Sequence, residues 1–241
     1  MEGELSYLYR DSELVVVNKP AGMIVHPHRR QRSSGFTLMK QVRDDLEQYV
    51  YPVHRLDRPV SGCTVFALTK KAARSLKENW HNNETVKEYL AFCFGQPPIE
   101  GVWEDSLKNH RGGDHDHYQL AKTKFRCLYK FPAMADVPPL SLMKIQIRSG
   151  RKHQIRRHFA HHHFPLVGDL TYGVERWNQT LRDRFQLKGL MLHAFQLSFV
   201  HPSNLEMVNT RAELPAYFRE VLQVLLKDMR KVLEIIENQK H

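Results

Sequence analysis

The amino-acid sequence predicts an α+β protein in which a mixed, mostly antiparallel central sheet carries flanking helices. Short runs rich in β-branched and aromatic residues recur along the 241 residues, and several of them stop at a proline or a glycine, which is typical of strands. Other segments repeat apolar residues at helical spacing. Helices that bury an apolar face against a sheet account for both patterns.

The predicted strands lie between turn-forming residues. Residues 13–17 (ELVVV) form a β-branched run that Pro20 and Gly22 interrupt. The other extended segments are residues 23–27, the stretch through Cys63 to Leu68, and residues 87–95, 122–131, 140–147 and 187–202. Residues 97–119 are rich in proline, glycine and histidine, so we expect a long exposed loop there. The basic residues 28–35 are expected to form a second surface loop.

The predicted helices bury one apolar face each. Residues 37–48 place Leu38, Val42 and Leu46 on one side, and residues 70–83 and 148–163 are the next helical segments. A C-terminal amphipathic helix is expected over about 213–238. Its apolar residues are Leu214, Phe218, Val221, Leu225, Met229, Val232 and Ile236.

The composition is that of a basic protein with a sizeable core. Hydrophobic residues make up 41% of the chain, and the net charge is +10 at pH 7. A surplus of cations favours a polyanionic partner, because each neutralised phosphate releases condensed counterions. No apolar run approaches the ~20 residues of a membrane span, and the N-terminus does not resemble a signal peptide. We therefore expect a single cytoplasmic domain over residues 1–241, with no membrane association and with its three cysteines reduced.

The segment His54 to Gly62 (HRLDRPVSG) concentrates charge at a break between strands. Asp57 lies between two arginines, and nearby cations favour the ionised form of a carboxylate. Physical chemistry leaves two interpretations open: a salt bridge that holds a turn, or a reactive carboxylate in a groove that receives RNA phosphates.

HRLDRPVSG closely resembles the signature of the RluA family of pseudouridine synthases, which surrounds a catalytic aspartate. Other segments resemble the family's remaining motifs in the same order. These segments are NKPAGMIVHP (18–27), KEYLAF (87–92), SGRKHQIRRHFA (149–160), GDLTYG (168–173) and LMLHAFQLSFVHP (190–202). The resemblance covers roughly residues 6–202 and implies the pseudouridine synthase fold. One position departs from it, since Val60 stands where the family usually has threonine.

The resemblance implies that the enzyme isomerises uridine to pseudouridine without a cofactor or a metal. Asp57 would act on the ribose, either as a nucleophile at C1′ or as a base at C2′. Tyr89 would stack on the base, and Arg156 would pair with Asp57. Leu192 would form an apolar wall of the uracil site. These three residues have alternative roles: Tyr89 as a core residue, Arg156 as a phosphate-binding residue, and Leu192 as a core residue.

The resemblance also implies contacts with RNA. The target uridine must leave the base stack at a cost of a few kcal/mol. Arg55 would fill the space left by the base, or else contact a phosphate. The further residues expected to bind substrate RNA are His54, Arg58, Arg151, Lys152 and Arg157.

The sequence contains 15 histidines, which raises the question of a metal site. His110, His115 and His117, with Asp114 and Asp116, are the candidate ligands. They follow no fixed metal-binding motif, so we expect no metal. His161, His162 and His163 are expected to continue the polar face of the helix before them.

Several family members carry an RNA-binding domain of the S4 type before the catalytic domain. Here the first motif begins at Asn18, so we expect no separate S4 domain. The sequence is most similar to the family's compact members. We expect a monomer, and a tRNA uridine in the T stem near the acceptor stem as the substrate. The alternatives are a synthase for ribosomal RNA and a non-catalytic RNA-binding protein.

Overall fold

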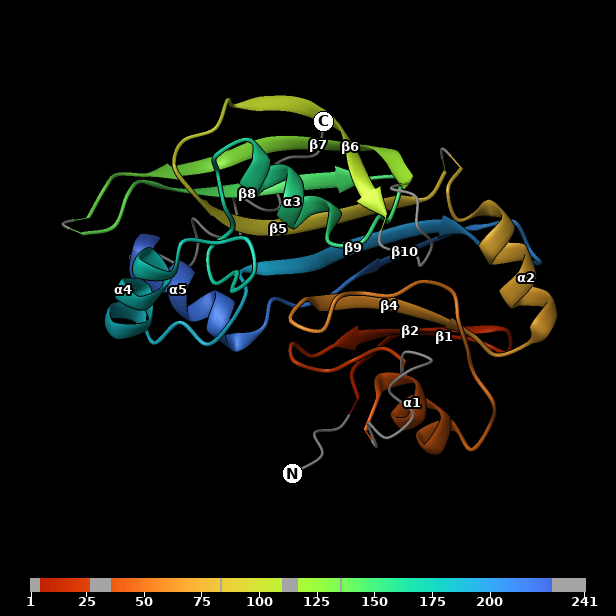
Figure 1. The fold of residues 1–241 in the computed structure, drawn as a ribbon. Helices are drawn as coiled ribbons and strands as arrows, with labels where there is room; N and C mark the ends of the chain where they lie inside the picture. Colours follow the sequence, from red (N-terminus) through yellow and green to blue (C-terminus); the bar gives the residue numbers. More distant parts are fainter. Residues whose placement is uncertain (1–4, 27–35, 83, 110–116, 135, 227–241) are drawn as a thin grey trace. The chain divides into compact units, whose positions relative to one another are not determined.

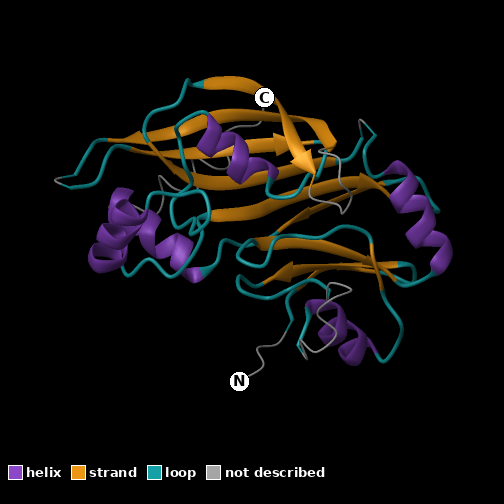
Figure 2. Cartoon of the chain, in the orientation of Figure 1, coloured by secondary structure: helices purple, strands orange, loops and turns teal. Residues whose placement is uncertain are grey.

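The computed structural model describes residues 5–26, 36–82, 84–109, 117–134 and 136–226 (Figure 1). The chain divides into two compact units, and neither is contiguous in sequence. Unit 1 comprises Met1–Glu88 and His193–Leu214, and unit 2 comprises Tyr89–Leu192 and Pro215–His241. The predicted α+β class, with mixed and mostly antiparallel strands, is confirmed (Figure 2).

Unit 1 is built on strands in the order β1-β2-β4-β9-β10. These strands are β1 (Tyr7–Arg10), β2 (Leu14–Lys19), β4 (Ser61–Ala67), β9 (Leu192–Val200) and β10 (Met207–Arg211), and the short β3 (Tyr51–Pro52) pairs with β4. All of these pairs are antiparallel except β4 with β9, which is parallel. Strand β4 is buried along its whole length, as its run of small and apolar residues predicts.

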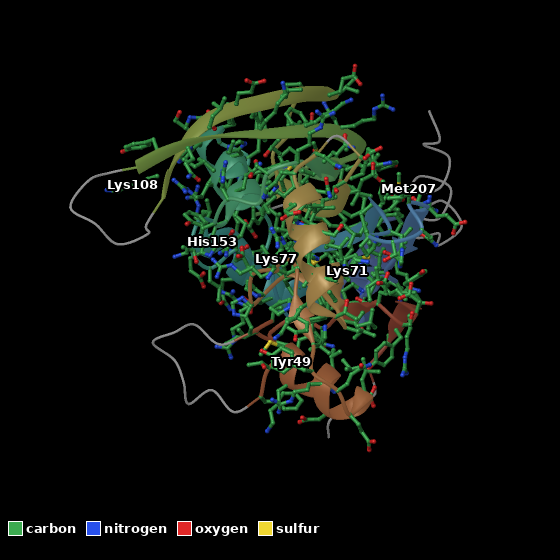
Figure 3. The ribbon with its side chains drawn as sticks, turned by 90° about the vertical axis from the view of Figure 1, so that its right-hand side faces the viewer. Tyr49, Lys71, Lys77, Lys108, His153 and Met207 are labelled. Carbon is green, nitrogen blue, oxygen red and sulfur yellow. The ribbon has the colours of Figure 1, made fainter. Side chains whose placement is uncertain are left out.

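Two helices belong to unit 1, and a threonine begins each. Thr37 precedes α1 (Leu38–Leu46) and accepts a hydrogen bond from the Lys40 amide, while Thr69 does the same for α2 (Lys70–Asn79). Helix α2 packs its buried side against a core cluster of apolar residues from β2, β4 and β9. Its lysines Lys71 and Lys77 are exposed on the opposite side (Figure 3).

Unit 2 holds a second group of strands in the order β5-β8-β7-β6. They are β5 (Val86–Phe94), β8 (Leu140–Ile147), β7 (His117–Phe131) and β6 (Glu100–Asn109). Strands β6 and β7 form an antiparallel hairpin with continuous register from Glu100↔Arg126 to Asn109↔His117. Aromatic side chains fill the core, where Phe92 contacts Phe131 and Phe218.

The helices of unit 2 are α3 (Gln154–His161), α4 (Glu175–Phe185) and α5 (Ala216–Leu226). Helix α3 lies against β6 and β7 (Figure 1). Trp103 on β6 contacts Phe159 on α3, which fixes the helix over the hairpin. No helix in the described part of the chain is long and apolar enough to cross a bilayer.

Two predictions about the fold were wrong, and some elements were not predicted. Residues 97–119 are not a long loop, since 100–109 and 117–119 belong to the hairpin strands β6 and β7. The alternation of buried and exposed side chains in β6 was masked by its many polar residues. Residues 23–26 form no strand, because the Ile24 and Val25 carbonyls accept from the Leu38 and Met39 amides of α1. Helix α4 and strand β10 were not predicted.

The histidines near the end of α3 also differ from the prediction. Helix α3 ends at His161, and His163 adopts a left-handed conformation with φ 67°. His158, one turn earlier in the same helix, is fully buried. Within the described ranges, no cluster of three potential ligands is arranged to hold a metal. Three segments of the sequence analysis lie outside the described residues. They are the side chains of the candidate ligands between His110 and His117, the loop 28–35, and the part of the C-terminal helix beyond Leu226.

Candidate active-site residues

Asp57 lies in a tight turn between β3 and β4 of unit 1. The Val60 amide donates to the Asp57 carbonyl at 3.0 Å, so residues 57–60 reverse direction directly before β4. The Asp57 side chain is partly exposed, whereas Val60 is buried. The turn therefore presents a carboxylate while its apolar end is anchored in the core.

Lys19 is buried beside this turn. Its Nζ donates to the carbonyls of Pro20, Met23 and Arg58 at 2.9, 2.7 and 3.3 Å. Burial lowers the pKa of Lys19 to about 7, and the negative charge of Asp57 opposes this shift. One ammonium group thus joins the NKPAGM segment to the Asp57 turn and places a cation near the carboxylate.

A second pair of hydrogen bonds joins the same two segments. The Gly22 amide donates to the Arg58 carbonyl at 2.8 Å, and Arg58 Nε donates to the Gly22 carbonyl at 2.9 Å. Gly22 has φ +84°, a conformation that glycine adopts without strain. Arg58, predicted to bind RNA, is exposed and also holds this turn; Arg55 is exposed as well.

His54 has a structural role that the sequence did not indicate. Its ring stacks on Trp80 with centroids 4.8 Å apart, and its Nε2 accepts a hydrogen bond from the Val65 amide at 3.2 Å. Burial, followed by the nearby charge of Lys87, lowers the pKa of His54 to about 3. Because the His54 ring is neutral and accepts a backbone hydrogen bond, it is better suited to holding the loop in position than to binding a phosphate.

Arg156 forms a buried ion pair in unit 2. Its Nε and one terminal nitrogen donate to the two carboxylate oxygens of Asp169, each at 2.7 Å. Burial alone would raise the pKa of Asp169, but the hydrogen bonds and charge of Arg156 outweigh it and hold the pKa below its usual value. The bidentate geometry fixes the plane of the guanidinium.

Asp169 also organises the GDLTYG segment around Arg156. Its Oδ1 accepts from the amides of Thr171 and Tyr172 at 2.9 and 3.0 Å. Asn178 on α4 accepts from the Gly168 amide and donates to the Asp169 carbonyl. The Tyr172 ring lies 5.2 Å from the Arg156 guanidinium, so the segment wraps the arginine.

Gln154 attaches the start of α3 to the hairpin. Its amide nitrogen donates to the Lys122 carbonyl and to the Thr123 hydroxyl, while its oxygen accepts from Ser149 and from the Arg151 amide. Arg157 donates to the Lys108 carbonyl at 3.0 Å. The GRKHQIRR segment is therefore fixed by backbone and side-chain contacts on β6 and β7.

The basic residues predicted to bind RNA differ in exposure. Arg151 and Lys152 precede α3 and are exposed, whereas Arg157 is partly buried through its bond to β6. His153, between Lys152 and α3, has φ 55° and its Nδ1 lies 3.0 Å from the Tyr172 hydroxyl. Figure 3 shows His153 and Lys108 on unit 2.

Tyr89 and Leu192, like Arg156, are buried candidates of unit 2, with exposed fractions of 8% and 3%. Alternation along β5 places Tyr89 on the face opposite Phe92 and Phe94. Tyr89 therefore does not belong to the aromatic core that contains Phe92 and Phe94. The predicted catalytic residues are divided, since Asp57 belongs to unit 1 whereas Tyr89 and Arg156 belong to unit 2.

Several supporting residues were missed by the sequence analysis. Lys19, Gln154, Asp169 and His193 all lie inside the quoted motifs, but no role was assigned to any of them. The signal was a charged or polar side chain inside an otherwise apolar segment, as in VVVNKP and LMLHAF. Such a residue must be satisfied by partners when it is buried.

Comparisons with known proteins give a consistent result. The family model described as RNA pseudouridylate synthase matches residues 13–161. A "tRNA pseudouridine synthase C" of Haemophilus ducreyi is 36% identical over 222 residues, which cover 88% of this chain and 91% of that protein. One from Vibrio cholerae is 37% identical over 236 residues, covering 93% and 95%. The solved structure "Human RNA Pseudouridylate Synthase Domain Containing 4" superposes with a TM-score of 0.70 at 25% identity, covering 92% of this chain and 93% of that one.

Replacing Lys19 with methionine should destabilise unit 1. Methionine fills a similar volume but donates no hydrogen bond, so three carbonyls lose a hydrogen bond from Lys19, and that of Arg58 keeps a second donor, the Gly22 amide. We expect the free energy of unfolding to fall by about 2–4 kcal/mol in urea titrations. Lys40→Met on the exposed side of α1 is the control and should change it by less than about 0.5 kcal/mol. Equal losses in the two variants would contradict the anchoring role of Lys19.

Replacing Asp169 with asparagine should destabilise unit 2. The substitution leaves the buried Arg156 guanidinium without its carboxylate, and loss of one partner of a buried pair costs about 3–5 kcal/mol. The control is Glu78→Gln, which breaks the exposed pair with Arg74 on α2 and should cost about 0.5 kcal/mol or less. Thermal unfolding measures both, and a stable Asp169→Asn protein would show that the pair is dispensable.

Proposed function

Because this chain belongs to the RNA pseudouridylate synthase family, it is an RNA pseudouridine synthase, and we propose that its substrate is tRNA. The relatives that match most of its length carry the name tRNA pseudouridine synthase C, which supports tRNA over ribosomal RNA. The basic charge of +10 suits a polyanionic substrate. We place the target uridine in the T stem near the acceptor stem.

We propose that Asp57 carries the chemistry. The observation that supports this most directly is the turn itself: residues 57–60 present a partly exposed carboxylate, and Lys19 and Gly22 hold the Arg58 carbonyl. The reaction breaks the N1–C1′ bond, turns the uracil and joins C5 to C1′. Asp57 acts either as a nucleophile at C1′ or as a base at C2′. Both routes need an ionised carboxylate.

We propose that Tyr89 and Arg156 act on the same nucleotide as Asp57. Arg156 is held by its bidentate pair with Asp169. We propose that it also pairs with Asp57 and orients that carboxylate. Tyr89 stacks on the uracil, and Leu192 lines the uracil site.

We propose that the exposed basic residues make the contacts with RNA. Arg55, Arg58, Arg151 and Lys152 are exposed and suit phosphate contacts. We propose that Arg55 fills the space left by the everted base. His54 and Arg157 are tied to the protein backbone and support these residues. The monomeric state, the single functional domain and the cytoplasmic location expected from the sequence remain predictions.

Replacing Asp57 with asparagine should abolish isomerisation and leave RNA binding within about threefold. Asparagine keeps the size of the side chain but is neither a nucleophile nor a base. The measurements are pseudouridine formation on unmodified tRNA and the Kd for the same RNA. Asp44→Asn on the exposed face of α1 is the matched control and should leave turnover unchanged. Full turnover by the Asp57→Asn enzyme would refute the assignment of the site.

The substrate can be identified by mapping pseudouridines in RNA from cells with and without the gene. We expect one tRNA position in the T stem to lose pseudouridine and to regain it when purified protein is added. A missing pseudouridine in ribosomal RNA instead would contradict the tRNA proposal but keep the enzyme class. Normal pseudouridine at every position, with RNA binding retained, would favour a non-catalytic RNA-binding protein.

A further inference from the structure

A buried serine–histidine pair lies directly behind the Asp57 turn in unit 1. Ser61 is the first residue of β4, and its Oγ lies 2.9 Å from Nδ1 of His193 on β9. Both side chains are buried, with exposed fractions of 1% and 0%. The second ring nitrogen of His193, Nε2, lies 3.2 Å from the Ala212 carbonyl. The three groups form one chain of hydrogen bonds across unit 1.

The direction of these hydrogen bonds follows from the carbonyl. A carbonyl oxygen accepts only, so Nε2 of His193 carries the proton and donates to Ala212. In a neutral ring Nδ1 then has a lone pair, and the Ser61 hydroxyl donates to it. Burial lowers the pKa of His193 to about 4, which keeps the ring in this neutral form at pH 7.

The backbone makes the same connection. Ser61 and Gly62 pair in parallel with His193 and Ala194, so β4 and β9 meet where the Asp57 turn ends (Figure 1). A Cβ on Gly62 would lie 2.2 Å from the Ala194 carbonyl oxygen, and Gly62 has φ +114°. Only glycine allows this approach, which brings Ser61 within reach of His193. Both ends of the turn are therefore fixed, one by Lys19 and Gly22 and the other by Ser61.

We propose that Ser61 and His193 are positioning residues that fix the reactive orientation of Asp57. The inference rests on the proposed role of Asp57. Neither residue touches the substrate, because both are buried and act through the backbone of residues 57–60. A catalytic group displaced by about 1 Å can lose up to ~100-fold in rate. The pair should therefore affect the chemical step rather than RNA binding.

The first test is Ser61→Ala. We expect the single-turnover rate on tRNA to fall about tenfold, while the Kd for tRNA stays within about twofold. The matched control is Ser141→Ala in unit 2, since the Ser141 hydroxyl is equally buried and donates to the Gly95 carbonyl at 2.9 Å. Both variants lose one buried hydroxyl, but only Ser61→Ala should lose rate. Equal rates for the two variants would overturn the proposal.

The second test compares two replacements of His193. Asparagine places an acceptor near the position of Nδ1 and can keep the Ser61 hydrogen bond, whereas glutamine reaches the Ala212 carbonyl but lacks that acceptor. We expect His193→Asn to retain several-fold more rate than His193→Gln. The single-turnover rate of the double variant, Ser61→Ala with His193→Gln, should lie within about twofold of the rate of His193→Gln alone. Both substitutions remove the same hydrogen bond, so the second one has little left to remove. Fully multiplicative losses would contradict a shared role.

The outcomes separate this proposal from the proposed function. If Asp57→Asn is inactive and Ser61→Ala matches the wild type, the positioning role fails and the site assignment stands. If Asp57→Asn is fully active, the site assignment itself fails. A loss of tRNA affinity in Ser61→Ala equal to the loss of rate would show that the pair shapes the RNA surface and would overturn the positioning role.

Discussion

A buried ammonium group needs a hydrogen-bond acceptor for each of its protons, and that requirement holds the reactive turn in place. Lys19 meets it with carbonyls from two separate segments, two next to its own position and one from Arg58. The cost of removing the charge from water is offset only while the Asp57 turn lies against the NKPAGM segment. The same arrangement places a cation near the carboxylate, so folding and electrostatics depend on one group.

The second unit applies the same rule with opposite charges. The Asp169 carboxylate is buried, and it is satisfied by the Arg156 guanidinium and by two backbone amides. An arginine held in a bidentate pair has one orientation, which a catalytic or binding role requires. In both units a buried charge is satisfied by backbone groups of a turn, and other arginines and lysines of the same segments are exposed.

Much of the fold followed from local patterns. The strands around Val15, Cys63 and Leu142 were predicted because each is a short, buried run of apolar and β-branched residues. The helix of Leu38, Val42 and Leu46 was predicted because its buried residues recur every four positions. Strand β6 and the first residues of β7 were missed because they are rich in polar residues and leave few side chains fully buried, so their sequence resembles a loop. Helix α4 was missed for a similar reason, since Asn178 and Leu181 are its only buried residues.

The sequence by itself determined the family and the enzyme class, because the motifs that carry the resemblance are short and contiguous. Only the tertiary structure decided which polar residues support them. The partners of Lys19, Asp169 and His193 are 39, 13 and 132 positions away in the chain, and no local pattern encodes which carbonyl, guanidinium or hydroxyl meets a buried group. His54 shows the same limit, since a ring beside two arginines suggests RNA contact until the fold stacks it on Trp80 and gives it a backbone amide.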